Sequence, residues 1–254
     1  MSKLILFSLF SSLVLIGCQE PSPSPFNNNT IAAAHPLASL AGKKMFEQGG
    51  NAFDAAVAAG FALAVVEPSM SGIGGRLQAI YHLTSGEIGG VDASTQVPSN
   101  YQPTAEKYSS GYKTIGIPGV VAGLLKLQKE HGQLPLKKVM EPAIEYAENG
   151  FQILAGEAYR QQMAKEVFKQ YEGTKTHFLD SQGASFQAGD TVVQKTLAST
   201  LKVISLNGKS GFYEGEVAQK MVEDIQSNGG LLTLEDLKNY KALDAEVFQG
   251  IFQG

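Results

Sequence analysis

Residues 49–68 read GGNAFDAAVAAGFALAVVEP, and residues 71–75 follow closely as SGIGG. Gly49-Gly50 predicts the end of one helix, and Asn51 can cap a second helix, which we expect over Ala52–Val66. This helix is apolar on nearly every face and too short to cross a bilayer, so we interpret it as buried at the centre of the fold. Asp54 within it is expected to be a buried, hydrogen-bonded anchor.

The segments on either side extend this pattern. Upstream, the apolar residues between Leu37 and Phe46 have helical spacing, which predicts a helix. Downstream, we expect a β-hairpin with strands near Arg76–Leu83 and Ile88–Ala93. The glycines of the 71–75 stretch form a backbone nest for an anion, permit a close approach beside an active site, or simply make a turn. The local sequence leaves these three interpretations open.

The rest of the chain is mostly helical in pattern. After a linker at about 98–111, helices are expected to begin near Pro118 and Pro135, with Pro142 kinking the second or starting another. Further helices are expected near 155–171, 192–206 and 216–228, and a short one is capped by Thr233 and Asp236. The tail 245–254 alternates like an unfinished strand. The fold class is therefore α/β with few strands, and so small a sheet needs further strands as partners.

Composition excludes several classes of protein. Of the 254 residues 43% are hydrophobic, so most of the chain is expected to fold. The single cysteine excludes a disulfide framework within the chain and a multi-cysteine zinc site. A net charge of -4 without a long basic run gives no sign of nucleic-acid binding. The four histidines have no metal-ligand spacing, and capping or solvated roles are expected for them.

The first residues have the pattern of an export signal. A lysine near the start precedes an apolar run that ends in Leu15-Ile16-Gly17-Cys18. This ending resembles the bacterial lipobox, whose cysteine receives a diacylglycerol. We therefore expect a lipoprotein signal peptide over residues 1–17, lipidation of Cys18 and a flexible tether over 18–30. By the same resemblance, Gln19 favours the periplasmic side of the outer membrane.

An ordered set of short motifs runs from about Ala34 to the end of the sequence. The motifs are His35-Pro-Leu-Ala-Ser39, 49–57, Val66-Glu-Pro68, 71–75, Gly116-Ile-Pro-Gly119, Glu141-Pro-Ala-Ile144, Ala147-Glu-Asn-Gly-Phe151, Phe212-Tyr-Glu-Gly215 and Asn228-Gly-Gly-Leu-Leu-Thr-Leu-Glu-Asp-Leu237. No single motif is diagnostic, but the ordered set is specific, and it resembles the N-terminal part of the γ-glutamyltransferase (γ-glutamyltranspeptidase) family.

The resemblance implies an N-terminal-nucleophile hydrolase with a four-layer αββα core, of which this chain supplies the helix-rich large-subunit part. In that family a precursor cuts itself, and the first threonine of the small subunit becomes the nucleophile, activated by its own α-amine. A γ-glutamyl group passes from glutathione or a relative to water or an amino acid. No metal or organic cofactor is implied, and the small subunit is the implied protein partner.

One segment resembles the family's self-cleavage site. Thr174-Lys-Thr176-His177-Phe178 is similar to the family's threonine-histidine run. The residues after it resemble ordinary large-subunit sequence. If Thr176 were the nucleophile, the small subunit would also be too short, because it has to supply half of the two packed sheets. We therefore expect no catalytic residue in this chain and place residues 31–254 in a large-subunit region truncated before the nucleophile.

The chain departs from the family at the substrate-binding arginine. Family members hold the substrate α-carboxylate with an arginine, where Ser94 stands here. A serine cannot supply a bidentate, charge-assisted contact. If Arg76 and Ser94 lie at the same end of the hairpin, Arg76 can replace the lost guanidinium, with Ser94 and Gln96 adding hydrogen bonds from one strand face. The alternative is that Arg76 is an ordinary surface arginine and the pocket has changed its substrate or lost it.

The sequence thus predicts an exported, lipid-anchored enzyme that transfers or hydrolyses γ-glutamyl groups, inactive as this chain alone. Two alternatives stay open. The first is a non-catalytic or degenerate envelope lipoprotein. The second is a sibling amidohydrolase, of the β-lactam acylase or poly-γ-glutamate depolymerase type, which the serine at position 94 favours.

Overall fold

The computed structural model describes residues 29–103 and 107–252. The predicted signal peptide, Cys18 and most of the predicted tether lie outside these residues. The helices of the described part are α1 (Pro36–Glu47), α2 (Ala52–Val66), the 3₁₀ turn η1 (Tyr112–Thr114), α3 (Val120–His131), α4 (Leu136–Asn149), α5 (Ala155–Phe168), α6 (Glu172–Phe178), α7 (Lys195–Asn207), α8 (Ser210–Tyr213), α9 (Gly215–Ser227) and α10 (Leu234–Asn239). The strands are β1 (Leu77–His82), β2 (Ile88–Ala93), β3 (Phe151–Gln152), β4 (Thr191–Val192) and β5 (Leu243–Asp244).

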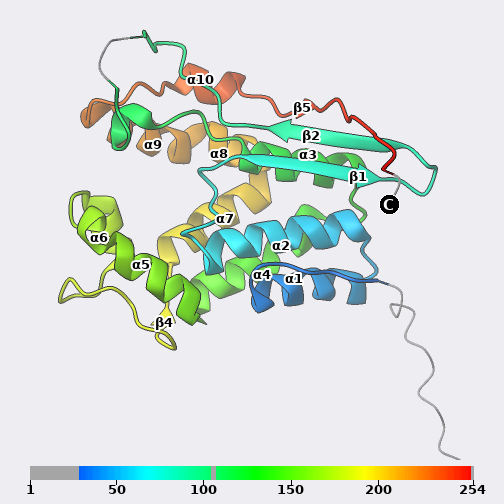
Figure 1. The fold of residues 1–254 in the computed structure, drawn as a ribbon, viewed down its shortest axis with the longest axis horizontal. Coiled ribbons are helices and arrows are strands. Elements are labelled where there is room, and N and C mark those ends of the chain that lie inside the picture. Colours follow the sequence, from blue (N-terminus) through cyan, green and yellow to red (C-terminus); the bar gives the residue numbers. More distant parts are fainter. Residues whose placement is uncertain (1–28, 104–106, 253–254) are drawn as a thin grey trace, which may run out of the picture.

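Helix α2 is the centre of the helical part, as predicted. The Oδ1 atom of Asn51 accepts hydrogen bonds from the amides of Phe53 and Asp54, and the Asn51 amide donates to the Asp54 carboxylate, which completes a capping box. Most of the helix is buried, and α1, α4 and α3 pack around it (Figure 1). No described helix is long and apolar enough to cross a membrane.

Asp54 is the buried anchor that the sequence predicted. Its side chain is 0% exposed, and besides the Asn51 amide it accepts from the Gln128 amide nitrogen at 2.7 Å. The backbone amides of Gln133 and Leu134 donate to it at 3.1 and 3.0 Å. One carboxylate therefore joins the start of α2 to the connection between α3 and α4.

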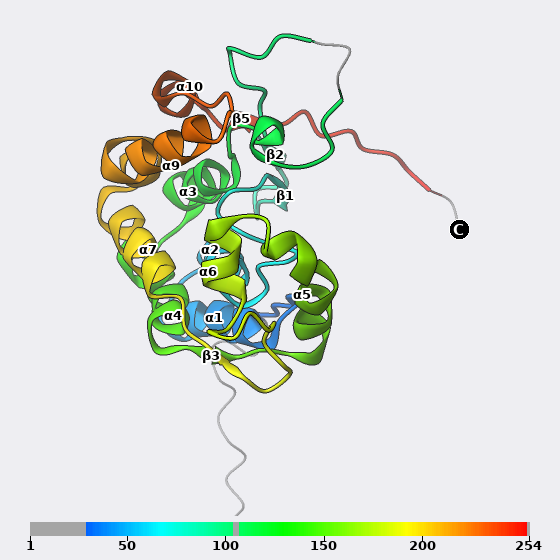
Figure 2. The same ribbon diagram turned by 90° about the vertical axis from the view of Figure 1, so that its left-hand side faces the viewer.

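The main sheet has the strand order β1-β2-β5, and all its pairs are antiparallel. Helix α3 contacts both β1 and β2 (Figures 1 and 2), and Phe53 of α2 contacts Tyr81 of β1, with ring centroids 5.4 Å apart. In the described part of the chain no helix covers the opposite face, where Ile80 is 75% exposed. The predicted need of this small sheet for partner strands agrees with that open face.

Several expected boundaries differ from those observed. Helix α7 begins at Lys195, because Thr191–Val192 instead pairs with β3 as strand β4. The strand expected in the tail is not found in its described part, 245–252, and the two-residue strand Leu243–Asp244 lies just before it. Pro142 lies inside the continuous helix α4.

Candidate functional site

The hairpin brings two predicted site residues to the same end, as expected. Leu77 pairs with Ala93, so Arg76 directly precedes β1 and Ser94 directly follows β2. The side chain of Arg76 is exposed, and that of Ser94 is partly buried. The described contacts do not join the two side chains, so their shared role in substrate binding stays a prediction.

Ser94 is held by neighbours that the sequence did not single out. Its hydroxyl donates to the Oδ1 atom of Asp92 at 2.5 Å, and its amide donates to the same oxygen at 2.9 Å. These two hydrogen bonds, with a smaller one from Gln78, lower the pKa of Asp92. The Tyr240 hydroxyl donates to the Ser94 carbonyl oxygen at 2.8 Å. The Ser94 hydroxyl therefore already donates its hydrogen to Asp92, and the negative charge of the Asp92 carboxylate lies next to it.

Gln96 lies beyond strand β2, which ends at Ala93. That its side chain shares a face with Ser94 stays a prediction. The backbone of Gln96 pairs with that of Ile117, with hydrogen bonds of 3.2 and 2.8 Å. The Gln96 side chain is exposed.

The glycine-rich turn, residues 71–75, is open around its glycines. A Cβ atom added to Gly72 or Gly74 meets no atom within 4 Å, and one added to Gly75 meets only a carbonyl oxygen at 3.9 Å. None of the three has a positive φ. Neither backbone strain nor crowding within this chain requires glycine here, so the bare backbone has room for an approaching group from elsewhere.

The end of this turn is fixed to the helix that follows the hairpin. The Gly75 carbonyl oxygen accepts from the amides of Gly119 and Val120, at the start of α3, at 2.8 and 3.1 Å. An apolar cavity of about 350 Å³ lies beside the turn and is bounded in part by Ile73, Gly74 and Phe212. Hairpin, turn and cavity therefore meet at one end of the sheet.

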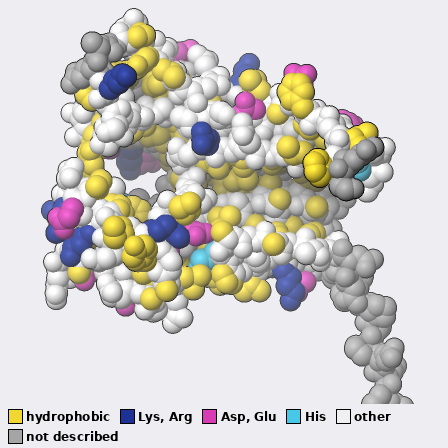
Figure 3. Space-filling view, viewed as in Figure 1, with side chains coloured by type: hydrophobic (Ala, Val, Ile, Leu, Met, Phe, Trp, Pro, Cys, Tyr) yellow, Lys and Arg dark blue, Asp and Glu magenta, His cyan; other side chains and the backbone are white. Residues whose placement is uncertain are grey.

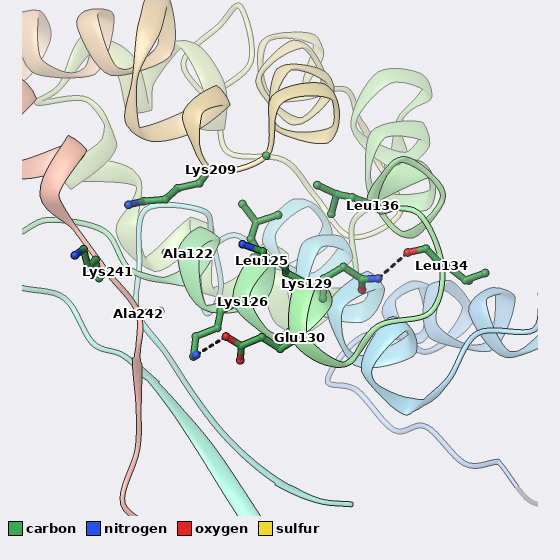
Figure 4. Close-up of a pocket in the computed structure, with 12 residues that line it drawn as sticks. Ala122, Leu125, Lys126, Lys129, Glu130, Leu134, Leu136, Lys209, Lys241 and Ala242 are labelled. Carbon is green, nitrogen blue, oxygen red and sulfur yellow. Dashed lines mark hydrogen bonds and ion pairs between the residues drawn. The ribbon is translucent and has the colours of Figure 1, made fainter.

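Two other cavities lie away from these residues. One, of about 700 Å³, lies between α3, the start of α4 and the segment at Lys241, with apolar walls and lysines at its edge (Figure 4). Lys126 there is paired with Glu130 at 2.6 Å. The other, of about 530 Å³, lies between η1, α6 and α9, on the side where Figure 3 shows a hollow. Neither cavity is lined by Arg76, Ser94 or Gln96.

The rejected nucleophile Thr176 is an exposed residue within α6, a helix that the sequence did not predict. Thr174, two residues earlier, donates its hydroxyl to the carbonyl oxygens of Phe168 and Tyr171. The threonine-histidine run is therefore a helix on the surface, not the free start of a strand.

Two histidines, His35 and His131, have structural surroundings. His35 caps α1, with its Nδ1 atom accepting from the Leu37 amide at 3.1 Å, and burial lowers its pKa against the opposing influence of Glu67 and Glu157. His131 stacks on Phe53 with ring centroids 4.4 Å apart. Within 29–103 and 107–252, no three His, Cys, Asp or Glu side chains are placed to hold a metal ion.

Comparison with known proteins places these features in a family. The sequence profile described as gamma-glutamyltranspeptidase matches residues 38–253. A glutathione hydrolase proenzyme of Pseudomonas sp. (strain A14) is 32% identical over 266 residues, which cover 100% of this chain and 46% of that relative. This chain thus spans less than half the length of that relative.

Solved structures have the same fold. The Helicobacter pylori gamma-glutamyltranspeptidase superposes with a TM-score of 0.85 at 38% identity, covering 89% of this chain and 69% of that one. A cephalosporin acylase from Bacillus halodurans gives a TM-score of 0.74 at 28% identity, covering 90% of this chain and 46% of that one. The fold is therefore the helix-rich portion of an N-terminal-nucleophile hydrolase of this type, and the chain belongs to the γ-glutamyltranspeptidase family.

Proposed function

We propose that this chain is the large-subunit portion of an enzyme that transfers or hydrolyses γ-glutamyl groups of glutathione-like compounds. The observation that carries the proposal is the match of residues 38–253 to the family, over only 46% of a curated proenzyme. The acyl-enzyme forms on a threonine beyond the matched part, and its α-amine acts as the base.

The open face of the β1-β2-β5 sheet supports a catalytic small subunit as the partner. Exposed Ile80 on β1 and exposed Phe248, Ile251 and Phe252 in the tail leave apolar area for further strands to cover. We therefore expect this chain to be inactive when expressed alone. Hydrolysis of a γ-glutamyl anilide by residues 1–254 alone would contradict this expectation.

Labelling tests the position of the nucleophile. The complete gene product, allowed to process, is treated with L-DON, which is bound in the solved structure of the Pseudomonas nitroreducens relative. We expect mass spectrometry to find the label on a threonine at the start of the small subunit. A label on any residue of 1–254, or the absence of a label together with the absence of turnover, refutes the proposal.

Arg76 is proposed to bind the substrate carboxylate. Its place at the same hairpin end as Ser94 supports this, because Asp92, which is hydrogen-bonded to Ser94, puts a negative charge there that a substrate carboxylate needs a cation to offset. In the processed enzyme, Arg76→Ala is expected to raise KM for a γ-glutamyl anilide about tenfold or more, since one lost charge-assisted contact contributes at least about 1.4 kcal/mol. Arg76→Lys keeps the positive charge but loses the bidentate geometry of the guanidinium, so comparison with Arg76→Ala separates the two contributions to binding. An unchanged KM in Arg76→Ala refutes the role.

The sibling amidohydrolase is a second candidate. The likeness to the cephalosporin acylase and the serine at position 94 favour it. Turnover of a glutaryl or β-lactam side-chain amide in preference to a γ-glutamyl anilide would select this candidate. A processed gene product without turnover of either substrate would favour the non-catalytic envelope protein.

We also propose that Cys18 carries a lipid and anchors the protein to the periplasmic side of the outer membrane. The apolar run ending in Leu15-Ile16-Gly17-Cys18 supports this. Metabolic labelling with an alkyne fatty acid is expected to mark the wild type and not Cys18→Ala. Equal labelling of both refutes the anchor.

A further inference from the structure

Glu157, on α5, is a buried carboxylate in contact with the segment that leads into the glycine-rich turn. Its side chain is 2% exposed. It accepts from the hydroxyl and, at 3.3 Å, the amide of Ser69, two residues before the turn. The Gln161 side-chain amide donates to it at 2.7 Å, and the Arg160 guanidinium at 3.0 Å. One helix thus holds a loop that lies 88 residues away in the sequence.

Arg160 closes the same cluster from the other side. Its Nη2 atom pairs with the Glu67 carboxylate at 2.6 Å, and its Nε atom donates to the Ser69 hydroxyl oxygen at 2.6 Å. Arg160 therefore holds both Glu67 and Ser69 of the loop, and Glu157 holds Ser69 as well. We refer to Glu67, Ser69, Glu157 and Arg160 as the α5–loop cluster.

Polar contacts carry much of the attachment of α5 to this loop. The buried residues of α5 are Glu157, Ala158 and Gln161, so two of the three are polar. Apolar packing tolerates small shifts, whereas a charged, hydrogen-bonded cluster in a low-dielectric environment is satisfied only in one arrangement. The cluster is thus suited to fixing the position of the loop.

The glycine-rich turn is held at its two ends and by one side chain between them. The α5–loop cluster holds the residues before it, and the amides of Gly119 and Val120 hold the Gly75 carbonyl oxygen after it. Ile73 packs against the hydrophobic core, whereas Gly72 and Gly74 have open space around them. Arg76 follows directly.

We propose that Glu157 and Arg160 are positioning residues that set the place of the glycine-rich turn, and through it of Arg76, for substrate binding. The proposal rests on the proposed γ-glutamyl chemistry but adds two residues on a helix outside the hairpin. Neither residue is assigned contact with substrate; they act through Ser69 and Glu67.

The test uses the processed, complete enzyme with Glu157→Gln and Arg160→Met. The matched control is Glu166→Gln with Lys169→Met, an exposed pair on the same helix at 2.7 Å. We expect the cluster variants to raise KM for a γ-glutamyl anilide about tenfold with kcat changed less, as for a misplaced substrate-positioning group. We also expect faster hydrogen–deuterium exchange in residues 67–76 but not in α2, and no change of either kind in the control.

Each outcome decides the proposal. Unchanged exchange at 67–76, or faster exchange with unchanged KM, overturns it, as does a general rise of exchange throughout the protein. If the wild type does not turn over the anilide, the proposed function fails, and exchange alone decides whether the cluster holds the turn. If Glu157→Gln does not fold, Arg160→Met, whose side chain is 34% exposed, carries the test.

Discussion

Removal of the Asp54 carboxylate is the sharpest test of how this fold is held together. Asp54→Ala removes an acceptor from four groups: the amides of Asn51, Gln133 and Leu134 and the side-chain amide of Gln128. Of these, the Gln128 amide retains the Leu134 carbonyl oxygen, at 2.9 Å. The three backbone amides retain no partner among the described contacts.

The expected loss in the free energy of unfolding can be worked out from these unpaired donors. A buried donor left unpaired costs about 1–3 kcal/mol, and more when its lost partner was charged. Gln133 is an exposed residue, so water offsets part of the loss at its amide; the Asn51 and Leu134 amides and the weakened Gln128 contact bring the total to roughly 3 kcal/mol. For a protein of this size, this is a fall in Tm of roughly 10 °C.

Urea unfolding followed by circular dichroism measures the effect, with the exposed Glu166→Gln as the control. Asp54→Asn removes the charge but keeps the shape of the side chain. The asparagine oxygen can still accept hydrogen bonds, whereas its NH₂ group faces amides that are themselves donors. We expect this variant to lose somewhat less stability than Asp54→Ala. A loss below about 1 kcal/mol in Asp54→Ala, equal to that of an ordinary surface substitution, would refute the anchor.

Two further predictions concern the hairpin end and the last helix. A Cβ atom at Gly119 lies 2.0 Å from the Ala93 carbonyl oxygen, so Gly119→Ala is expected to cost about 3 kcal/mol in urea unfolding, against little for Gly72→Ala, where the space is open; equal losses would contradict this. Burial raises the pKa of Asp236, but hydrogen bonds from Ser99 and Thr233 outweigh it and hold the pKa below its usual range. The folded carboxyl binds its proton less readily than the unfolded one, so its contribution is present above about pH 4 and is lost as the pH falls through the lower folded value. Asp236→Asn is therefore expected to flatten the loss of stability below pH 4, and an unchanged pH profile would contradict the role.

Local patterns predicted the elements whose signals are local. The cap at Asn51 and the glycines before it determined the start of α2, and the capping box of Thr233 and Asp236 determined the start of α10. Helix α6 was missed because its seven residues include a glycine and two threonines and bury none of its side chains. Strand β4 was assigned to a helix because two residues show no periodicity, and only pairing with β3 defines it.

By itself, the sequence determined the family, the central buried helix, the hairpin and the anchor at Asp54, because each depends on neighbouring residues or on an ordered set of motifs. Only the tertiary structure showed that the Ser94 hydroxyl is used by Asp92 and that Glu157 and Arg160 hold Ser69. It also showed that the glycines of the turn have open space around them. Side-chain partners and free space depend on how elements far apart in the sequence pack against each other. The local periodicity of the sequence does not determine that packing.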